Sequence, residues 1–254
     1  MTTFVMIPDY QGKATMAAAT HASSIIANIL GTYPRLMVVP VLNGDDQGKL
    51  LDVAKTTRSS RMLPIVGDYV ERKLVGALMS GYARLANNCA ADDVVVRLDT
   101  AEHNIAHIGE LAWQAEKHGA VVGDLDFSVG GHLVEGTYDW FIHTDVFPEL
   151  YGAMTEGKLR LSCAHGYQAY RAGVLKEILP MAKLLVERVE KNLNTTLTWG
   201  MDGIMAITAV SAFGTIHRML IPAESDRNRS ADKINAQLGQ HCAILKAAAQ
   251  MQMI

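Results

Sequence analysis

The sequence predicts an α/β fold in which a mainly parallel central sheet carries helices on both faces. Three observations lead to this prediction. Apolar and helical segments alternate along the first half of the chain. The apolar segments are continuous runs of Val, Ile and Leu, as in parallel strands that are buried on both faces. Polar residues follow the ends of these runs, which is where ligands bind in open α/β sheets.

The first half contains five predicted strands and four predicted helices. The strands are expected at residues 2–8, 35–47, 61–69, 92–99 and 120–127. The helices between them are expected at 14–33, 48–59, 71–90 and 104–119. Pro8 closes the first strand and Gly31 lies near the end of the first helix, in agreement with the usual stop signals.

The second half is less regular. The stretch 128–147 is rich in Gly and aromatic residues and predicts a loop or hairpin region, and 158–193 predicts a turn followed by a helix that is interrupted or ends near Pro180. A buried helix over 199–214, a short strand over 215–222, a polar loop and a final helix from residue 234 complete the chain. No linker is apparent, so we expect one domain over 1–254, with 1–127 and 128–254 as its halves.

Composition narrows the class of protein. The chain has 254 residues, 49% of them hydrophobic, and a formal net charge of -3, so nucleic acid and anionic membranes are not expected partners. No apolar run reaches the roughly 20 residues of a membrane helix, and the start has no signal-peptide pattern. Three cysteines without a CxxC pair indicate reduced thiols in a cytoplasmic protein.

The stretch "DVVVRLDTAEH" places Asp99 directly after a buried strand. A hard cation such as Mg²⁺ or Mn²⁺ takes oxygen ligands from one or two side chains and completes its shell with phosphates and water. Asp99 fits that role, but an Asp at this position also commonly caps the next helix. Asp124 and Asp126, at the end of another strand, form a rival metal site or a solvent-exposed pair.

Four further residues are candidates for function. Asp202, between two glycines at a predicted helix start, could act as a general base or as a helix N-cap. His217 lies in a short apolar strand and is a candidate metal ligand or an ordinary core or surface histidine. Arg227 and Arg229 lie in a polar loop, where they could clamp phosphates or be solvated.

Four segments resemble, in order, parts of GT-A-fold glycosyltransferases of the family 2 type. "FVMIPDYQGK" is similar to the opening strand of those enzymes, with Pro8 and Tyr10 matching, and "VPVLNGDDQGKLLDVA" is similar to their second strand and acidic turn. "LVGALMSGYARLANNCAADDVVVRLDTAEH" resembles their helix and the strand that precedes the DxD motif. "CAHGYQAYRAGVLKEIL" resembles their acceptor-side segment. Ala101 occupies the third DxD position, and the acidic partner is displaced to Glu102.

The resemblance implies transfer of a sugar from a nucleoside diphosphate sugar to a hydroxyl acceptor, with Mn²⁺ or Mg²⁺ as cofactor. Asp202 would be the catalytic residue, and Asp99 and His217 would hold the metal. Gly166 and Tyr167 would bind the acceptor. The residues implied in donor binding are Pro8, Tyr10, Asp45, Asp46, Arg97, Asp99, Arg227 and Arg229.

Two alternatives to this hexosyltransferase prediction stay open. A sugar-1-phosphate nucleotidyltransferase uses a similar α/β layout, but it needs a Gly-rich loop with an Arg after the first strand, and "PDYQGKATM" has one Gly and no Arg. A non-catalytic nucleotide-sugar-binding protein would explain the altered DxD. The sequence leaves donor base, acceptor and homo-oligomer formation open.

Overall fold

The structure is a computed structural model of the chain. It describes residues 1–9, 16–42, 59–67, 70–98, 105–126, 137–160, 167–222 and 230–254. Several predicted site residues lie outside these ranges: Tyr10, Asp45, Asp46, Asp99, Gly166, Arg227 and Arg229.

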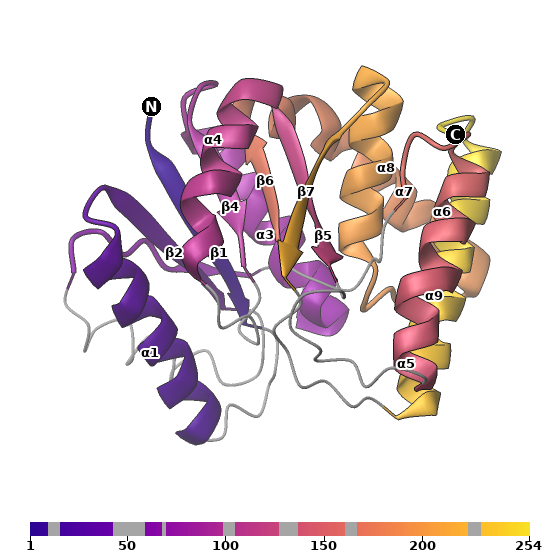
Figure 1. Cartoon of the computed structure of the whole chain (residues 1–254), viewed down its shortest axis with the longest axis horizontal. Coiled ribbons are helices and arrows are strands. Elements are labelled where there is room, and N and C mark those ends of the chain that lie inside the picture. The colour runs from indigo at the N-terminus through magenta and orange to yellow at the C-terminus, as the bar shows by residue number, and fades with distance from the viewer. Residues whose placement is uncertain are drawn as a thin grey trace.

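The described residues build a sheet of seven strands in the order β3-β2-β1-β4-β6-β5-β7 (Figure 1). In chain order the strands are β1 (Thr3–Asp9), β2 (Leu36–Leu42), β3 (Ile65–Val66), β4 (Val94–Arg97), β5 (Ala120–Asp126), β6 (Gln168–Arg171) and β7 (His217–Pro222). Neighbouring strands are parallel except around β6, which runs antiparallel between β4 and β5. The parallel strands therefore end at one edge of the sheet, called here the carboxyl edge, where β6 begins. The arrowheads of β1, β5 and β7 point to this edge in Figure 1.

Helices cover both faces of the sheet. α1 (Met16–Thr32) and α4 (Ile108–His118) pack on one face, called here the α4 face. The opposite, α8 face is covered by α3 (Lys73–Asn88), α7 (Ala172–Leu193) and α8 (Met201–Phe213). α9 (Ala231–Gln250) packs on α7 and α8, and α6 (Phe147–Met154) packs on α9. The short helical turns are η1 (Val70–Arg72), η2 (Ile105–His107), α5 (Tyr138–Phe141) and the π-helical η3 (Ile142–Val146).

Alternation along the strands distributes side chains between the two faces. In β4, Val94 and Val96 belong to the core cluster on the α4 face, whereas Val95 belongs to the cluster on the α8 face. Successive strand residues point to opposite faces, so a strand buried on both sides has an unbroken apolar sequence. This is why "VVV" predicts a central strand, and it places Arg97, two residues after Val95, on the α8 face.

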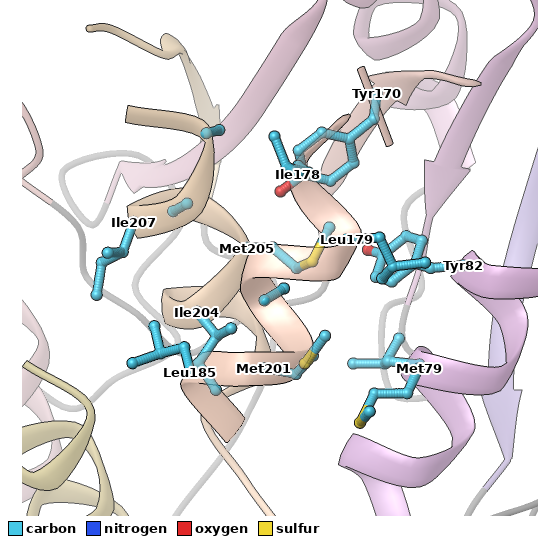
Figure 2. Packing of buried hydrophobic residues seen from close by; sticks show 14 of the residues in the cluster. Met79, Tyr82, Tyr170, Ile178, Leu179, Leu185, Met201, Ile204, Met205 and Ile207 are labelled. Atoms are coloured by element: carbon cyan, nitrogen blue, oxygen red, sulfur yellow. The ribbon is translucent and has the colours of Figure 1, made fainter. Parts of the chain in front are cut away.

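α8 is apolar around almost its whole circumference, which is typical of a helix surrounded by other elements. Figure 2 shows Met201 and Met205 of α8 turned toward Met79 and Tyr82 of α3 and Leu179 of α7. Both α8 methionines are fully buried. α8 is thus fixed in the core, and its first turn lies near the sheet.

The predicted α/β architecture and its mainly parallel sheet are confirmed, but three local predictions are wrong. The antiparallel strand β6 was not predicted, because four residues with polar ends give too short a pattern. Residues 138–147 are helical rather than part of a hairpin, and α7 continues through Pro180. None of the helices in the described ranges is both long and apolar enough to cross a membrane.

Candidate active site

Arg97, the last residue of β4, lies at the carboxyl edge of the sheet, and its charged side chain is on the α8 face. It pairs in register with Gln168, the first residue of β6. Its side chain is only 1% exposed. A buried guanidinium is costly unless a partner compensates its charge, so the identity of that partner is informative.

The partner is Asp202, in the first turn of α8. Arg97 Nη1 donates to Asp202 Oδ1 in an ion pair, and Gln168 Nε2 donates to the Asp202 backbone oxygen at 3.1 Å. Gly200 is the N-cap residue, with φ of +92°, so Asp202 lies inside the helix rather than capping it. A carboxylate in the first turn is also favoured by the helix dipole. No hydrogen bond to Asp202 Oδ2 is found among the described residues.

Two tyrosines lie beneath this ion pair. Tyr170 Oη donates to Gln168 Oε1 at 3.1 Å, and the ring of Tyr82 packs edge-on to Tyr170 with centroids 5.9 Å apart. Burial raises the pKa of both phenols well above the usual value, and the opposing effect of the Arg97 charge is smaller. Both tyrosines therefore stay neutral. Within the described ranges, Arg97 Nε and Tyr82 Oη have no hydrogen-bond partner.

A second ion pair on the α8 face joins Asp124 of β5 to Arg218 of β7. Asp124 is 7% exposed, and Arg218 Nη2 donates to Asp124 Oδ2. A single strand, β6, separates β4 from β5, so Arg97 and Asp124 originate roughly 10 Å apart across the sheet. Asp124 already neutralises an arginine, which weakens its predicted role as a metal ligand. The side chain of Asp126 lies outside the described residues.

His217 does not lie at the carboxyl edge, so the predicted location is wrong. It begins β7, pairs with Val121, and belongs to the strand positions that face α4. Its ring stacks on that of His118 with centroids 4.1 Å apart and an interplanar angle of 2°. Three strand spacings, roughly 14 Å, separate it from β4, and it points away from the Arg97 face. His217 is therefore not placed to share a metal ion with a residue at the carboxyl edge.

The structure argues against the predicted role of Tyr167 but agrees with the expected location of Pro8. Tyr167 is 3% exposed in the core cluster of the α4 face, where its ring packs edge-on to His107. Its side chain is therefore on the opposite face from Asp202, and we do not retain it as an acceptor-binding group. Pro8 is buried near the end of β1, at the expected carboxyl edge.

The remaining predicted residues lie outside the described ranges, but their described neighbours share one edge. β1 ends at Asp9, β2 at Leu42 and β4 at Arg97, and all three strands are parallel. Within the described ranges, no three His, Cys, Asp or Glu side chains gather in a way that could hold a metal ion. Among the predicted site residues that the structure describes, only Arg97 and Asp202 are brought into contact.

Comparison with solved structures identifies the architecture. The galactosyltransferase LgtC, in complex with donor and acceptor sugar analogs, is 13% identical; the match covers 85% of this chain and 73% of that chain with a TM-score of 0.50. The chain has a GT-A-type fold. A 4-diphosphocytidyl-2C-methyl-D-erythritol synthase matches at 13% identity over 94% of this chain and 97% of its own, with a TM-score of 0.49. TarS from S. aureus matches at 11% identity over 89% and 59%, with a TM-score of 0.47. Neither a family model nor a curated protein matches the sequence.

The Arg97–Asp202 pair is a candidate site because of where it lies in the sheet. Open α/β sheets bind ligands outside the carboxyl ends of their strands, and this pair lies at that edge. Sequence reasoning did not single out Gln168, because β6 was not predicted. The sequence did contain one signal, the pair of glycines on either side of Asp202. The reason for these glycines becomes clear only from the packing of α8.

Proposed function

We propose that this protein transfers a sugar from a nucleoside diphosphate sugar to a hydroxyl acceptor, at the carboxyl edge of its sheet. The observation that carries the proposal is the buried ion pair between Arg97 and Asp202, held at that edge in a GT-A-type fold. Core stability alone does not require it, because a buried ion pair is often no more stabilising than apolar residues of similar size. Positioning a carboxylate for chemistry is the role that we assign to it.

The reaction requires one bond to form and one to break. The acceptor oxygen bonds to the anomeric carbon of the donor, and the bond from that carbon to the diphosphate oxygen breaks, with its electron pair leaving on the nucleoside diphosphate. The acceptor proton passes to Asp202 if the configuration inverts, through the oxygen that Arg97 does not engage. If the configuration is retained, Asp202 orients the acceptor or the sugar. Arg97 fixes the carboxylate, and its positive charge lies near the anionic donor.

Donor and acceptor contacts are assigned to segments that follow or precede described strands at this edge. Pro8 lies near the end of β1, and in the sequence Tyr10 follows β1, Asp45 and Asp46 follow β2, and Asp99 follows β4. These residues, together with Arg227 and Arg229 between β7 and α9, are proposed to bind the nucleoside diphosphate sugar. Gly166, just before β6, is proposed to lie on the acceptor side.

A divalent metal remains a separate proposal that rests on Asp99. The described carboxylates at this edge, Asp124 and Asp202, are each engaged by an arginine, and they do not form a metal site. One carboxylate can suffice when phosphates and water supply the other ligands of Mg²⁺ or Mn²⁺. Loss of turnover in EDTA that returns with Mn²⁺ or Mg²⁺, together with failure of Asp99→Asn to recover, would support the metal. Full turnover in EDTA would remove it.

Release of nucleoside diphosphate from UDP-glucose, UDP-galactose, UDP-N-acetylglucosamine and GDP-mannose tests the proposal, with water as the simplest hydroxyl acceptor. Wild-type protein should turn over at least one donor, and Asp202→Asn should be slower by about a hundredfold or more. Glu149→Gln, which removes an exposed acid paired with Arg160, is the matched control and should retain activity. Pyrophosphate release from a nucleoside triphosphate and a sugar 1-phosphate, without donor turnover, would replace the proposal with nucleotidyl transfer.

A further inference from the structure

A buried tyrosine–histidine pair lies against the first turn of α8. Tyr151 of α6 is fully buried and His241 of α9 is 4% exposed. Tyr151 Oη and His241 Nδ1 are hydrogen-bonded at 2.7 Å. The ring of Phe147 lies 4.8 Å from that of His241 and encloses the pair with apolar surface. Burying two polar side chains here gives the core nothing that apolar residues could not give, which suggests a more specific role.

The pair touches the backbone beside Asp202. A Cβ atom added at Gly203 would lie 2.1 Å from Tyr151 Oη and 3.4 Å from His241 Nδ1, so only glycine allows this approach. A Cβ added at Gly200 would lie 2.4 Å from Ile244 Cδ1 of α9. The two glycines that bracket Asp202 are therefore the points at which the helices α6 and α9 contact the start of α8.

His241 acts here without a charge. Burial and, to a smaller extent, the neighbouring His143 lower its pKa to about 3. At neutral pH the imidazole is therefore uncharged and does not compete with Arg97 for the Asp202 carboxylate. What the pair can supply is a fixed surface, because the hydrogen bond holds both rings in place.

We propose that Tyr151 and His241 are positioning residues, which fix the first turn of α8 so that the Asp202 carboxylate meets the acceptor in the reaction proposed above. This inference rests on that proposed function. Asp202 is then held from three sides: by Arg97 at its carboxylate, by Gln168 at its backbone oxygen, and by the pair at the adjacent residue. Small displacements of a reacting group are costly in rate, since productive geometry tolerates little movement.

The first arm of the test is kinetic, with nucleoside diphosphate release from whichever of the four donor sugars the wild type turns over. Tyr151→Phe removes only Oη and should lower kcat by about tenfold while donor KM stays within about twofold, because the donor contacts are elsewhere. His241→Asn, which keeps a hydrogen-bonding atom near Nδ1, should retain more activity than His241→Leu. Thr208→Val removes a buried hydroxyl from the same helix, α8, and is the control that should keep wild-type kcat.

The second arm needs no activity. The coupling between Arg97→Met and Asp202→Asn is measured by urea unfolding in a double-mutant cycle, first in the wild type and then in Tyr151→Phe. If Oη fixes the first turn of α8, the coupling constant should fall by at least about threefold in Tyr151→Phe and stay unchanged in Thr208→Val.

The two arms separate the two claims. An unchanged coupling constant in Tyr151→Phe overturns the positioning role, whatever the activity, as does wild-type kcat in a variant that folds normally. A reduced coupling constant in a protein that turns over none of the four donors supports the positioning role and removes the proposed transfer instead.

Discussion

Replacing Asp202 with Asn should destabilise the protein, because the Arg97 guanidinium would remain buried without a counter-charge. Arg97 is 1% exposed and Asp202 is 15% exposed. Removing one partner of a buried ion pair costs about 3–5 kcal/mol. Asn can still accept a hydrogen bond, and water reaches this partly exposed position, so we expect the lower end, about 3 kcal/mol.

Urea unfolding measures this loss as a lower midpoint with an unchanged slope. In a thermal scan the melting temperature should fall by roughly 6–12 °C, at about 2–4 °C per kcal/mol for a domain of this size. Arg97→Met in the Asp202→Asn background should recover part of the loss, because the unpaired charge is removed.

Glu149→Gln is the matched control, since it breaks an ion pair whose side chains are 48% and 72% exposed. Exposed pairs contribute about 1 kcal/mol or less. If Asp202→Asn costs no more than this control, then Arg97 is not a buried charge that depends on Asp202, and the structural reasoning about the site is wrong.

Two further predictions concern stability. Gly203→Ala should lower the free energy of unfolding by about 1–3 kcal/mol, since its Cβ would collide with Tyr151 Oη, whereas Gly239→Ala in α9, where the Cβ meets open space, should raise it by about 0.5–1 kcal/mol; equal denaturation midpoints for the two variants would contradict the packing of α8. The pKa of His217 is lowered and that of His241 is lowered to about 3, so as the pH falls the unfolded chain binds protons before the folded protein does. The contribution of these histidines to the free energy of unfolding is therefore complete above about pH 6.5. For His241 it falls by roughly 1.4 kcal/mol per pH unit as the pH drops toward 3. His241→Gln should flatten the dependence measured by urea unfolding at pH 7, 5.5 and 4.5, and an unchanged slope would contradict the buried neutral imidazole.

Much of the fold follows from the sequence because strand and helix periods are local. The run Val94–Val96 predicts a central strand, and the structure agrees. β6 escaped prediction because its placement between β4 and β5 depends on pairing with strands far away in sequence. Four residues with Gln168 and Arg171 at their ends offer no distinctive pattern.

The residues of the candidate site could be predicted from the sequence, but the contact between them could not. Asp202 and Arg97 were each named from their local sequence, yet they are 105 positions apart, and nothing local shows that they pair. For His217 the error is of a different kind, because the strand was predicted correctly and the position of the side chain was not. Register decides which face a strand residue occupies, and a shift of one position reverses it. The structure puts His217 against His118 on the α4 face.

The most direct test of the account is to locate where a nucleoside diphosphate binds, by following backbone amide resonances while UDP or GDP is added. The account predicts that the largest changes occur at the carboxyl edge, at the amides of Leu98, Gln168 and Asp202. The apolar groove between α6 and α9, lined by Leu150 and Leu245 among others, serves as the internal control and should not respond. Changes confined to that groove, or no changes with either nucleotide, would contradict the assignment of the carboxyl edge as a nucleotide-sugar site.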